Sequence, residues 1–200
     1  MATPRATATL RPIATPRLDR SSVLINEILP RPGAVDWNED GVVDAGDAWI
    51  ELTNATRRIV DISGWVLEVA GDDLSMDDEA RNTYRFAEGT ILRAGGFVVV
   101  HSQESGLILT HAGIQAREGV TLTLRLRDEE DRSRDEVGAE DMARLARLEP
   151  DQVLARDNRG EWQSGWEPTP GRANTPPQVP RPPVELDNLF QRLLERLRRR

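Results

Sequence analysis

The 200-residue sequence contains no cysteine and no lysine, and it has only two histidines. Without cysteine the chain can form no disulfide, no thiolate zinc site and no cysteine nucleophile. Without lysine it has neither the lysine of a phosphate-binding P-loop nor the amine that Schiff-base chemistry requires. All 26 basic residues are therefore arginines, a bias that a GC-rich genome would explain.

Long apolar runs are also missing. No stretch approaches the roughly 20 apolar residues of a membrane-spanning helix, and the N-terminus has no apolar signal-peptide core. The formal net charge is −8 at pH 7, which disfavours a broad surface for nucleic-acid phosphates. Nucleic acid is therefore an unfavoured partner, although arginines near both termini could contact phosphates.

Both ends of the chain differ in composition from its centre. Residues 1–21 are almost entirely Ala, Thr, Pro and Arg, which predicts a disordered linker because so little apolar surface is available for burial. An organellar targeting peptide is the alternative for this segment. Residues 176–184 form a second, proline-rich linker.

Residues 185–200 change to helical spacing, with leucines and a phenylalanine on one face. The pattern predicts an amphipathic helix with acids near its start and arginines at its end, which suits the helix dipole. A helix this short is marginal alone in water. We expect it to dock on this domain, on a second copy or on another protein, and an anionic membrane surface is a further alternative.

The central segment, residues 22–175, has the period-two pattern of β-strands. Turn signals every 8–12 residues separate six to nine short strands, which predicts an antiparallel sandwich or barrel. "EDMARLARLEPDQV" is the only helix-like part, and "EWQSGW" predicts one last strand. In "AWIELTN" the alternation places Trp49 with Glu51 on one face and Ile50 with Leu52 on the other. The other residues expected on buried faces are Val23, Ile25, Ile28, Leu122, Leu124 and Leu126.

Four segments occur in the order found in the lamin tail domain family, and each resembles the family's motif. They are "VLINEILPRP", "AWIELTNATRRIVDISGWVL", "YRFAEGTILRAGGFVVV" and "PTPGRANTPP". The resemblance covers roughly residues 22–175. It implies an all-β fold, an immunoglobulin-like antiparallel β-sandwich of the lamin tail type. It also implies a non-catalytic module of secreted or surface-associated bacterial proteins.

Turn chemistry supports the same fold. Gly64 permits a tight turn before the large Trp65 side chain, and Asp61 and Ser63 can bond local backbone groups there. The pair Gly95-Gly96 predicts a hairpin. The segment 140–152 is longer and more helical than the family's last strands, so it predicts a local departure in topology.

Between the first two predicted strands lies an acidic loop, "DWNEDGVVDAGD", residues 36–47. Its spacing, D-x-N-x-D-G-x-x-D-x-x-D, is that of a calcium loop of the EF-hand or dockerin type, in which alternating oxygen ligands converge as the chain bends at glycine. Asp47 replaces the EF-hand's final glutamate, as in dockerin-like loops. We therefore predict a calcium site, and the alternative is a solvated acidic loop. The predicted ligands are Asp36, Asn38, Asp40, the Val42 carbonyl, Asp44 and Asp47.

No catalytic motif emerges from the sequence. It has no G-x-S-x-G elbow, no H-E-x-x-H and no dinucleotide fingerprint, and His101 and His111 have no recognisable metal-ligand spacing. We therefore predict that the chain is not an enzyme.

The sequence instead favours a calcium-stabilised binding or adhesion module for an unknown protein or cell-surface ligand. The expected location is extracellular or at the cell surface, and a cytoplasmic location stays open. The alternative is an accessory subunit that associates, with itself or with a partner, through residues 185–200.

Overall fold

The structure is a computed structural model that describes residues 23–71, 82–105 and 122–177. The predicted linker 1–21, most of the linker 176–184, the helix 185–200 and His111 lie outside the described residues. Most of the acidic segment "GDDLSMDDEARN", residues 71–82, also lies outside them.

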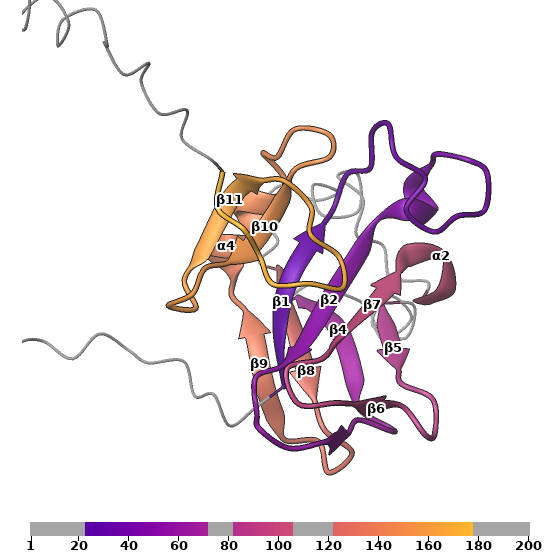
Figure 1. Cartoon of the computed structure of the whole chain (residues 1–200), viewed down its shortest axis with the longest axis vertical. Helices are drawn as coiled ribbons and strands as arrows, with labels where there is room; N and C mark the ends of the chain where they lie inside the picture. Colours follow the sequence, from indigo (N-terminus) through magenta and orange to yellow (C-terminus); the bar gives the residue numbers. More distant parts are fainter. Residues whose placement is uncertain (1–22, 72–81, 106–121, 178–200) are drawn as a thin grey trace, which may run out of the picture.

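The described residues fold into two antiparallel sheets (Figure 1). The first sheet has the strand order β11-β10-β1-β2-β7, and the second has the order β5-β4-β8-β9. The first contains β1 (Val23–Leu29), β2 (Trp49–Asn54), β7 (Phe97–His101), β10 (Val153–Arg156) and β11 (Trp162–Trp166). The second contains β4 (Val66–Gly71), β5 (Thr83–Arg85), β8 (Leu122–Arg127) and β9 (Ser133–Val137).

Two very short strands, β3 (Val60–Asp61) and β6 (Ile91–Leu92), pair with each other. The helical elements among the described residues are the 3-10 turn η1 (Ala45–Asp47), α2 (Ser102–Ser105) and α4 (Ala139–Leu145). The chain is thus an all-β, immunoglobulin-like antiparallel β-sandwich, as the sequence predicted.

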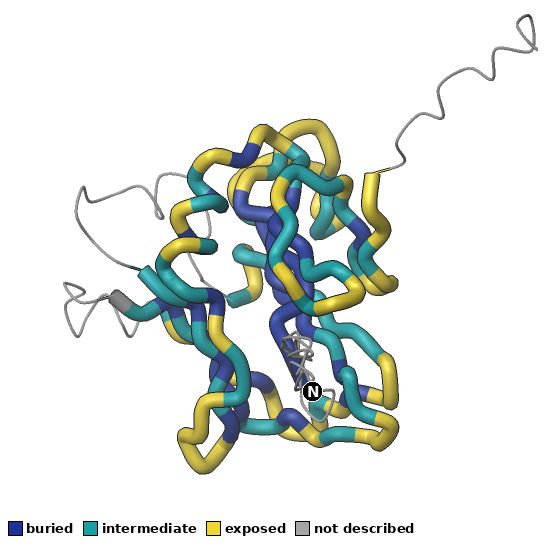
Figure 2. Tube along the Cα trace, turned by 90° about the vertical axis from the view of Figure 1, so that its left-hand side faces the viewer, coloured by how far each residue is buried: buried dark blue, intermediate teal, exposed yellow. Residues whose placement is uncertain are grey.

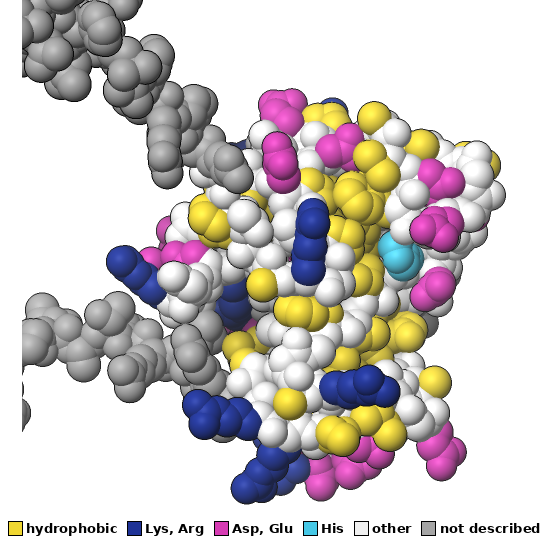
Figure 3. Space-filling model, viewed as in Figure 1, with side chains coloured by type: hydrophobic (Ala, Val, Ile, Leu, Met, Phe, Trp, Pro, Cys, Tyr) yellow, Lys and Arg dark blue, Asp and Glu magenta, His cyan; other side chains and the backbone are white. Residues whose placement is uncertain are grey.

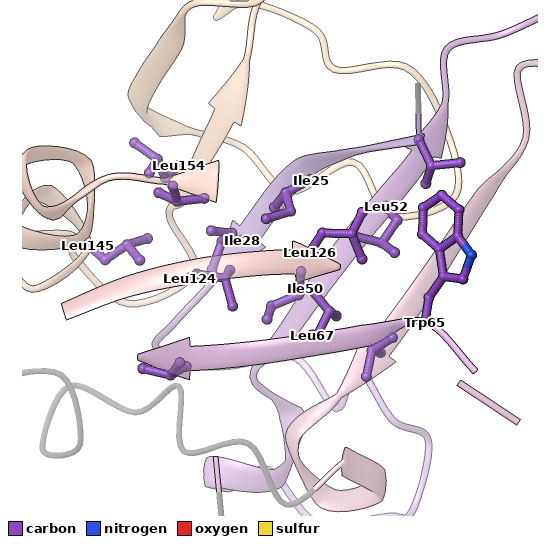
Figure 4. Packing of buried hydrophobic residues seen from close by; sticks show 14 of the residues in the cluster. Ile25, Ile28, Ile50, Leu52, Trp65, Leu67, Leu124, Leu126, Leu145 and Leu154 are labelled. Atoms are coloured by element: carbon purple, nitrogen blue, oxygen red, sulfur yellow. The ribbon is translucent and has the colours of Figure 1, made fainter. Parts of the chain in front are cut away.

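The hydrophobic core lies between the two sheets (Figure 4). The first sheet contributes Ile25, Ile28, Ile50 and Leu52, and the second contributes Leu67, Leu124 and Leu126, all with no exposed surface. Leu145 of α4 closes one side of this core. Burial of each such side chain contributes about 1.5–3 kcal/mol relative to an exposed one.

A β-bulge explains how Ile25 and Ile28, three residues apart, both face the core. The register between β1 and β2 shifts between Ile25 and Glu27, so one extra residue, Asn26, is accommodated on β1. Beyond the bulge Glu27 lies directly opposite Glu51. The bulge therefore decides which side of the sheet each later β1 side chain occupies.

Turns at one end of the sandwich follow the predicted chemistry. The Asp61 carboxylate accepts hydrogen bonds from the Ser63 N–H at 2.9 Å and the Ser63 hydroxyl at 2.5 Å. Gly64 has a φ of 73°, the left-handed conformation that glycine tolerates best. Trp65 follows with 7% of its surface exposed, and the Arg134 guanidinium lies 5.3 Å from its ring centroid.

Two details differ from the sequence predictions. Gly95-Gly96 does not close a hairpin, because β6 pairs with β3 whereas β7 pairs with β2. The glycines instead carry the chain between sheets, and Asn54 holds them through backbone bonds to Gly95 and Gly96. The sequence pattern also does not predict the strand β10, because this strand directly follows the helical pattern of α4 and the loop after it.

The outer face of the first sheet is covered by residues 167–177, which follow β11 and are here called the strap. In Figure 1 the strap crosses in front of β1 and β2. All seven residues of β1 are buried, and Figure 2 shows β1 and β2 as the most enclosed part of the chain. A second, smaller apolar cluster lies on this outer face and contains Leu29, Trp49, Val153 and Ala155.

Candidate metal centre and buried glutamates

The acidic loop lies between β1 and β2 and packs on α2. The Asn38 side-chain amide donates to the Gln103 side chain of α2 at 2.5 Å, and the Ser102 N–H donates to the Ala48 carbonyl at 2.7 Å. Acidic side chains gather over this end of the face shown in Figure 3. The loop is thus held at its base while its acidic rim stays exposed.

Asp36 organises the first half of the loop. Its carboxylate accepts hydrogen bonds from the Asp40 N–H at 3.1 Å and the Gly41 N–H at 2.7 Å. The Asn38 side-chain oxygen accepts from the same Asp40 N–H at 3.1 Å. The side-chain oxygens of Asp36 and Asn38 therefore converge on one backbone nitrogen. Gly41, with a φ of 91°, makes the predicted bend.

Asp44 and Asp47 organise the second half around η1. Asp44 caps this turn, since its carboxylate accepts from the Gly46 N–H at 2.6 Å. Asp47 has no exposed surface. Its Oδ1 accepts from the N–H groups of Trp37 at 2.6 Å and Asn38 at 3.0 Å, and its Oδ2 accepts from the Asp44 N–H at 2.8 Å. Asp47 thereby joins both halves of the loop.

The surroundings of Asp47 favour its ionised form. Burial alone would raise its pKa, but the three N–H donors and the nearby His101 outweigh burial and lower the pKa below its ordinary value. A buried carboxylate with three backbone donors stabilises the loop in any case. Asp47 therefore has a structural role whether or not a cation binds.

The predicted ligands are brought to one loop but not into a closed cage. Asp36, Asn38 and Asp40 are linked by hydrogen bonds within one turn, whereas Asp44 and Asp47 face η1. Val42 is 56% exposed, and the use of its carbonyl as a ligand stays a prediction. Within the described residues, no group of three or more Asp, Glu or His side chains already has the geometry to hold a metal.

Aromatic side chains lie beneath this loop. Trp37, from the loop, packs edge-on against Trp49 with ring centroids 6.2 Å apart. Trp49 lies opposite His101 in the register of β2 and β7. The indole nitrogens of Trp37 and Trp49 and Nδ1 of His101 are buried without hydrogen-bond partners among the described residues. The loop therefore covers an end of the sheet that is lined largely by aromatic side chains.

A second polar cluster, which sequence reasoning did not identify, lies beneath the strap. Glu27 and Glu51 are direct cross-strand partners, and neither has exposed surface. Glu27 accepts hydrogen bonds from the Thr169 N–H at 3.1 Å and the Thr169 hydroxyl at 3.0 Å. Glu51 accepts from the Asn26 amide at 2.6 Å and the Gly171 N–H at 2.5 Å.

Asn174 completes this cluster. Its amide nitrogen donates to the backbone carbonyls of Asn26 at 3.0 Å and Arg156 at 2.8 Å, and its side-chain oxygen accepts from the Asn26 amide at 3.0 Å. The strap is therefore held to β1, β2 and β10 mainly by polar groups. The motif "PTPGRANTPP" supplies those groups.

Burial shifts the pKa values of both glutamates upward. Desolvation raises the pKa of Glu27 to about 8, with a further contribution from the charge of Glu51, and bonds from Thr169 only partly offset it. Desolvation likewise raises the pKa of Glu51 to about 7, against bonds from Asn26 and Gly171. The sequence held one signal for this pair, a glutamate in each of two adjacent buried strands.

No helix among the described residues combines the length and the apolar character needed to cross a membrane.

Comparison with known proteins adds one match. The family model of the lamin tail domain matches residues 17–141, which include β1 through β9 and the start of α4. The strands β10 and β11 and the strap lie beyond the matched residues. No curated protein matches the chain. Since the match spans more than half of the sequence and the fold agrees with it, this chain belongs to the lamin tail domain family.

Proposed function

We propose that this chain is a non-catalytic binding module of a secreted or surface-associated bacterial protein, and that its acidic loop binds calcium. Domains of this immunoglobulin-like family are generally binding modules rather than catalysts. Its partner is a protein or a cell-surface ligand. The role of residues 185–200 in association stays a separate prediction.

One observation carries the calcium proposal: the side-chain oxygens of Asp36 and Asn38 both lie 3.1 Å from the Asp40 nitrogen. The oxygens of positions 1 and 3 thus point to the same backbone N–H, that of position 5, which supports a curled loop. A hard cation with six to eight oxygen ligands would need the Asp40 side chain to join them. The bend at Gly41 and the spacing through Asp47 agree with the same geometry.

The hydrogen bonds of the loop leave room for a cation. A carboxylate has about four lone-pair sites, and each oxygen of Asp36 accepts one N–H. Asp36 therefore keeps one lone pair on each oxygen for a metal. Asp47 has fewer lone pairs left for a metal, because its oxygens already accept three N–H groups. Binding would then draw the Asp40 and Asp44 side chains inward.

Calcium would stabilise the domain by mass action. Extracellular calcium modules bind as weakly as about 10⁻⁴–10⁻³ M. For a Kd of about 10⁻⁴ M, 10 mM calcium would contribute about 2.7 kcal/mol. A chain of this size then gains roughly 5–11 °C in Tm.

The test compares thermal unfolding in 10 mM calcium with unfolding in chelator. Asp36→Asn and Asp40→Asn should each abolish most of the calcium-dependent gain. Glu149→Gln is the matched control, because Glu149 is exposed in a different loop, and it should keep the full gain. An equal Tm with calcium and with chelator in the unmodified chain would refute the proposal.

A further inference from the structure

The hydroxyl of Thr169 has more acceptors than hydrogens. It lies 3.0 Å from Oε2 of Glu27 and 3.2 Å from Oδ1 of Asn174. A hydroxyl has one hydrogen, whereas an ionised carboxylate and an amide oxygen can only accept. Oδ1 of Asn174 already accepts from the Asn26 amide at 3.0 Å. Its contact with Thr169 is also a hydrogen bond only if Glu27 is protonated and donates to the Thr169 hydroxyl.

We infer that Glu27 is protonated while the strap is closed, and that loss of this proton at alkaline pH opens the strap. In the closed state the Glu27 hydroxyl donates to Thr169, and Thr169 donates to Asn174. Ionised Glu27 would compete with Asn174 for the one hydroxyl hydrogen. It would also place a second negative charge directly opposite Glu51 on adjacent strands.

The other groups around Glu27 do not neutralise that charge. Opposite Glu27, β10 presents Ala155, and opposite Glu51, β7 presents Val99, so both flanking strands are apolar here. The strap contributes the positive charge of Arg172, which lowers the pKa of Glu27 by less than burial raises it. Arg156 of β10 directs its guanidinium to Asp135 and to the Ile25 carbonyl instead.

The shifted pKa values agree with this geometry. The pKa of Glu27 is raised to about 8 and that of Glu51 to about 7. An exposed glutamate has a pKa near 4.3, so an open strap would release the protons at neutral pH. Opening is therefore favoured as pH rises, about tenfold per pH unit for each proton. Between pH 7 and pH 8 most of the effect comes from the proton of Glu27, and the remaining part of the Glu51 proton contributes less.

The experiment measures amide hydrogen exchange of Thr169 and Gly171, whose N–H groups bond to the two glutamates, after correction for the intrinsic rate. We expect strap opening to increase about tenfold from pH 7 to pH 8 and to level off by pH 9. The Gly95 amide, which bonds to Asn54 at another end of the sheet, should show no such increase.

Two variants distinguish the contributions of the two glutamates to strap opening. In Glu27→Gln, opening should rise by no more than about twofold from pH 7 to pH 9, the share of Glu51, because the glutamine amide donates as the protonated acid does. In Glu51→Gln, the increase should remain and shift to lower pH. An increase in Glu27→Gln equal to that of the unmodified chain would overturn the inference.

A measurement on the unmodified chain is decisive if a variant fails to fold. Carbon-13 NMR of the Glu27 carboxyl should give a titration midpoint near pH 8. A midpoint near pH 4.5, or strap amides whose opening does not change from pH 7 to pH 9, would overturn the inference.

Discussion

The carboxylate of Asp135, on β9 of one sheet, accepts the backbone N–H of Ile25, on β1 of the other sheet, at 2.8 Å. The same carboxylate receives two hydrogen bonds from Arg156 of β10, at 2.9 and 3.0 Å. Asp135 and Arg156 are only 13% and 11% exposed. This ion pair therefore joins the two sheets at the edge next to the β1 bulge.

Asp135→Asn should destabilise the domain by about 3 kcal/mol, because it leaves a mostly buried arginine without its charged partner. For a chain of this size the loss in Tm is roughly 6–12 °C. Chemical denaturation measures the loss in the free energy of unfolding. Glu136→Gln is the control on the same strand: its pair with Arg125 is more than 40% exposed on both sides, so the change should stay below about 1 kcal/mol. Equal losses in the two variants would contradict this role for Asp135.

Asn54→Ala should lower the free energy of unfolding by about 2 kcal/mol. The Asn54 amide donates to the carbonyls of Arg58, Leu92 and Arg93, and its oxygen accepts from the Thr56 N–H. Removing the side chain leaves buried backbone groups without partners. Urea titration measures the loss, and a variant as stable as the unmodified chain would show that water replaces these bonds.

Asp47→Asn should destabilise the chain at pH 7 by about 1–3 kcal/mol, because an amide cannot accept all three N–H bonds. The lowered pKa of Asp47 fixes the sign of the pH dependence. The ionised Asp47 carboxylate stabilises the fold fully above its pKa in the unfolded chain, about 3.9. This stabilisation is lost as the pH falls through its lower pKa in the folded chain. The difference between variant and unmodified chain should therefore shrink below about pH 4.

Asp44→Asn is the matched control for Asp47, measured in chelator. Asparagine caps a turn about as well as aspartate, so this variant should lose little at any pH. If the difference between Asp47→Asn and the unmodified chain stayed constant from pH 7 to pH 2, the carboxylate would not be the stabilising group.

Global stability should fall as the pH rises from about 4.5 to about 8. Both buried glutamates have raised pKa values, so the folded state keeps protons that the unfolded state has already released. Each retained proton lowers the free energy of unfolding by roughly 1.4 kcal/mol per pH unit in that window. Denaturation at pH 5 and pH 8 should show the loss, and Glu27→Gln should reduce it. A chain equally stable at both pH values would contradict the burial of these acids in the folded state.

The sequence predicted the inner face of the sandwich well but not its outer face. Ile50, Leu52, Leu124 and Leu126 follow strict alternation, which is a local property of each strand. Glu51 alternates with Ile50 and Leu52, and Glu27 alternates with Ile28 beyond the β1 bulge, so these two charged residues would be read as solvent-facing. They are buried because the strap covers them, and Thr169 lies 142 residues from Glu27 in the sequence. No local pattern records that coverage.

The acidic loop shows the same division. Its spacing predicted the bend at Gly41 and the curl of Asp36, Asn38 and Asp40, because those depend on neighbours in sequence. The burial of Asp47 depends on β2 and on the N–H groups of Trp37 and Asn38, which only the folded loop brings together. Its structural role could therefore not be predicted from spacing alone.

The most direct test of the calcium-binding proposal is a calorimetric titration of the chain with calcium up to 10 mM, repeated on Asp40→Asn. We predict one binding site per chain, with a Kd of about 10⁻⁴–10⁻³ M, and no saturable heat for the variant. No saturable heat in the unmodified chain, or equal heat in the variant, would contradict it.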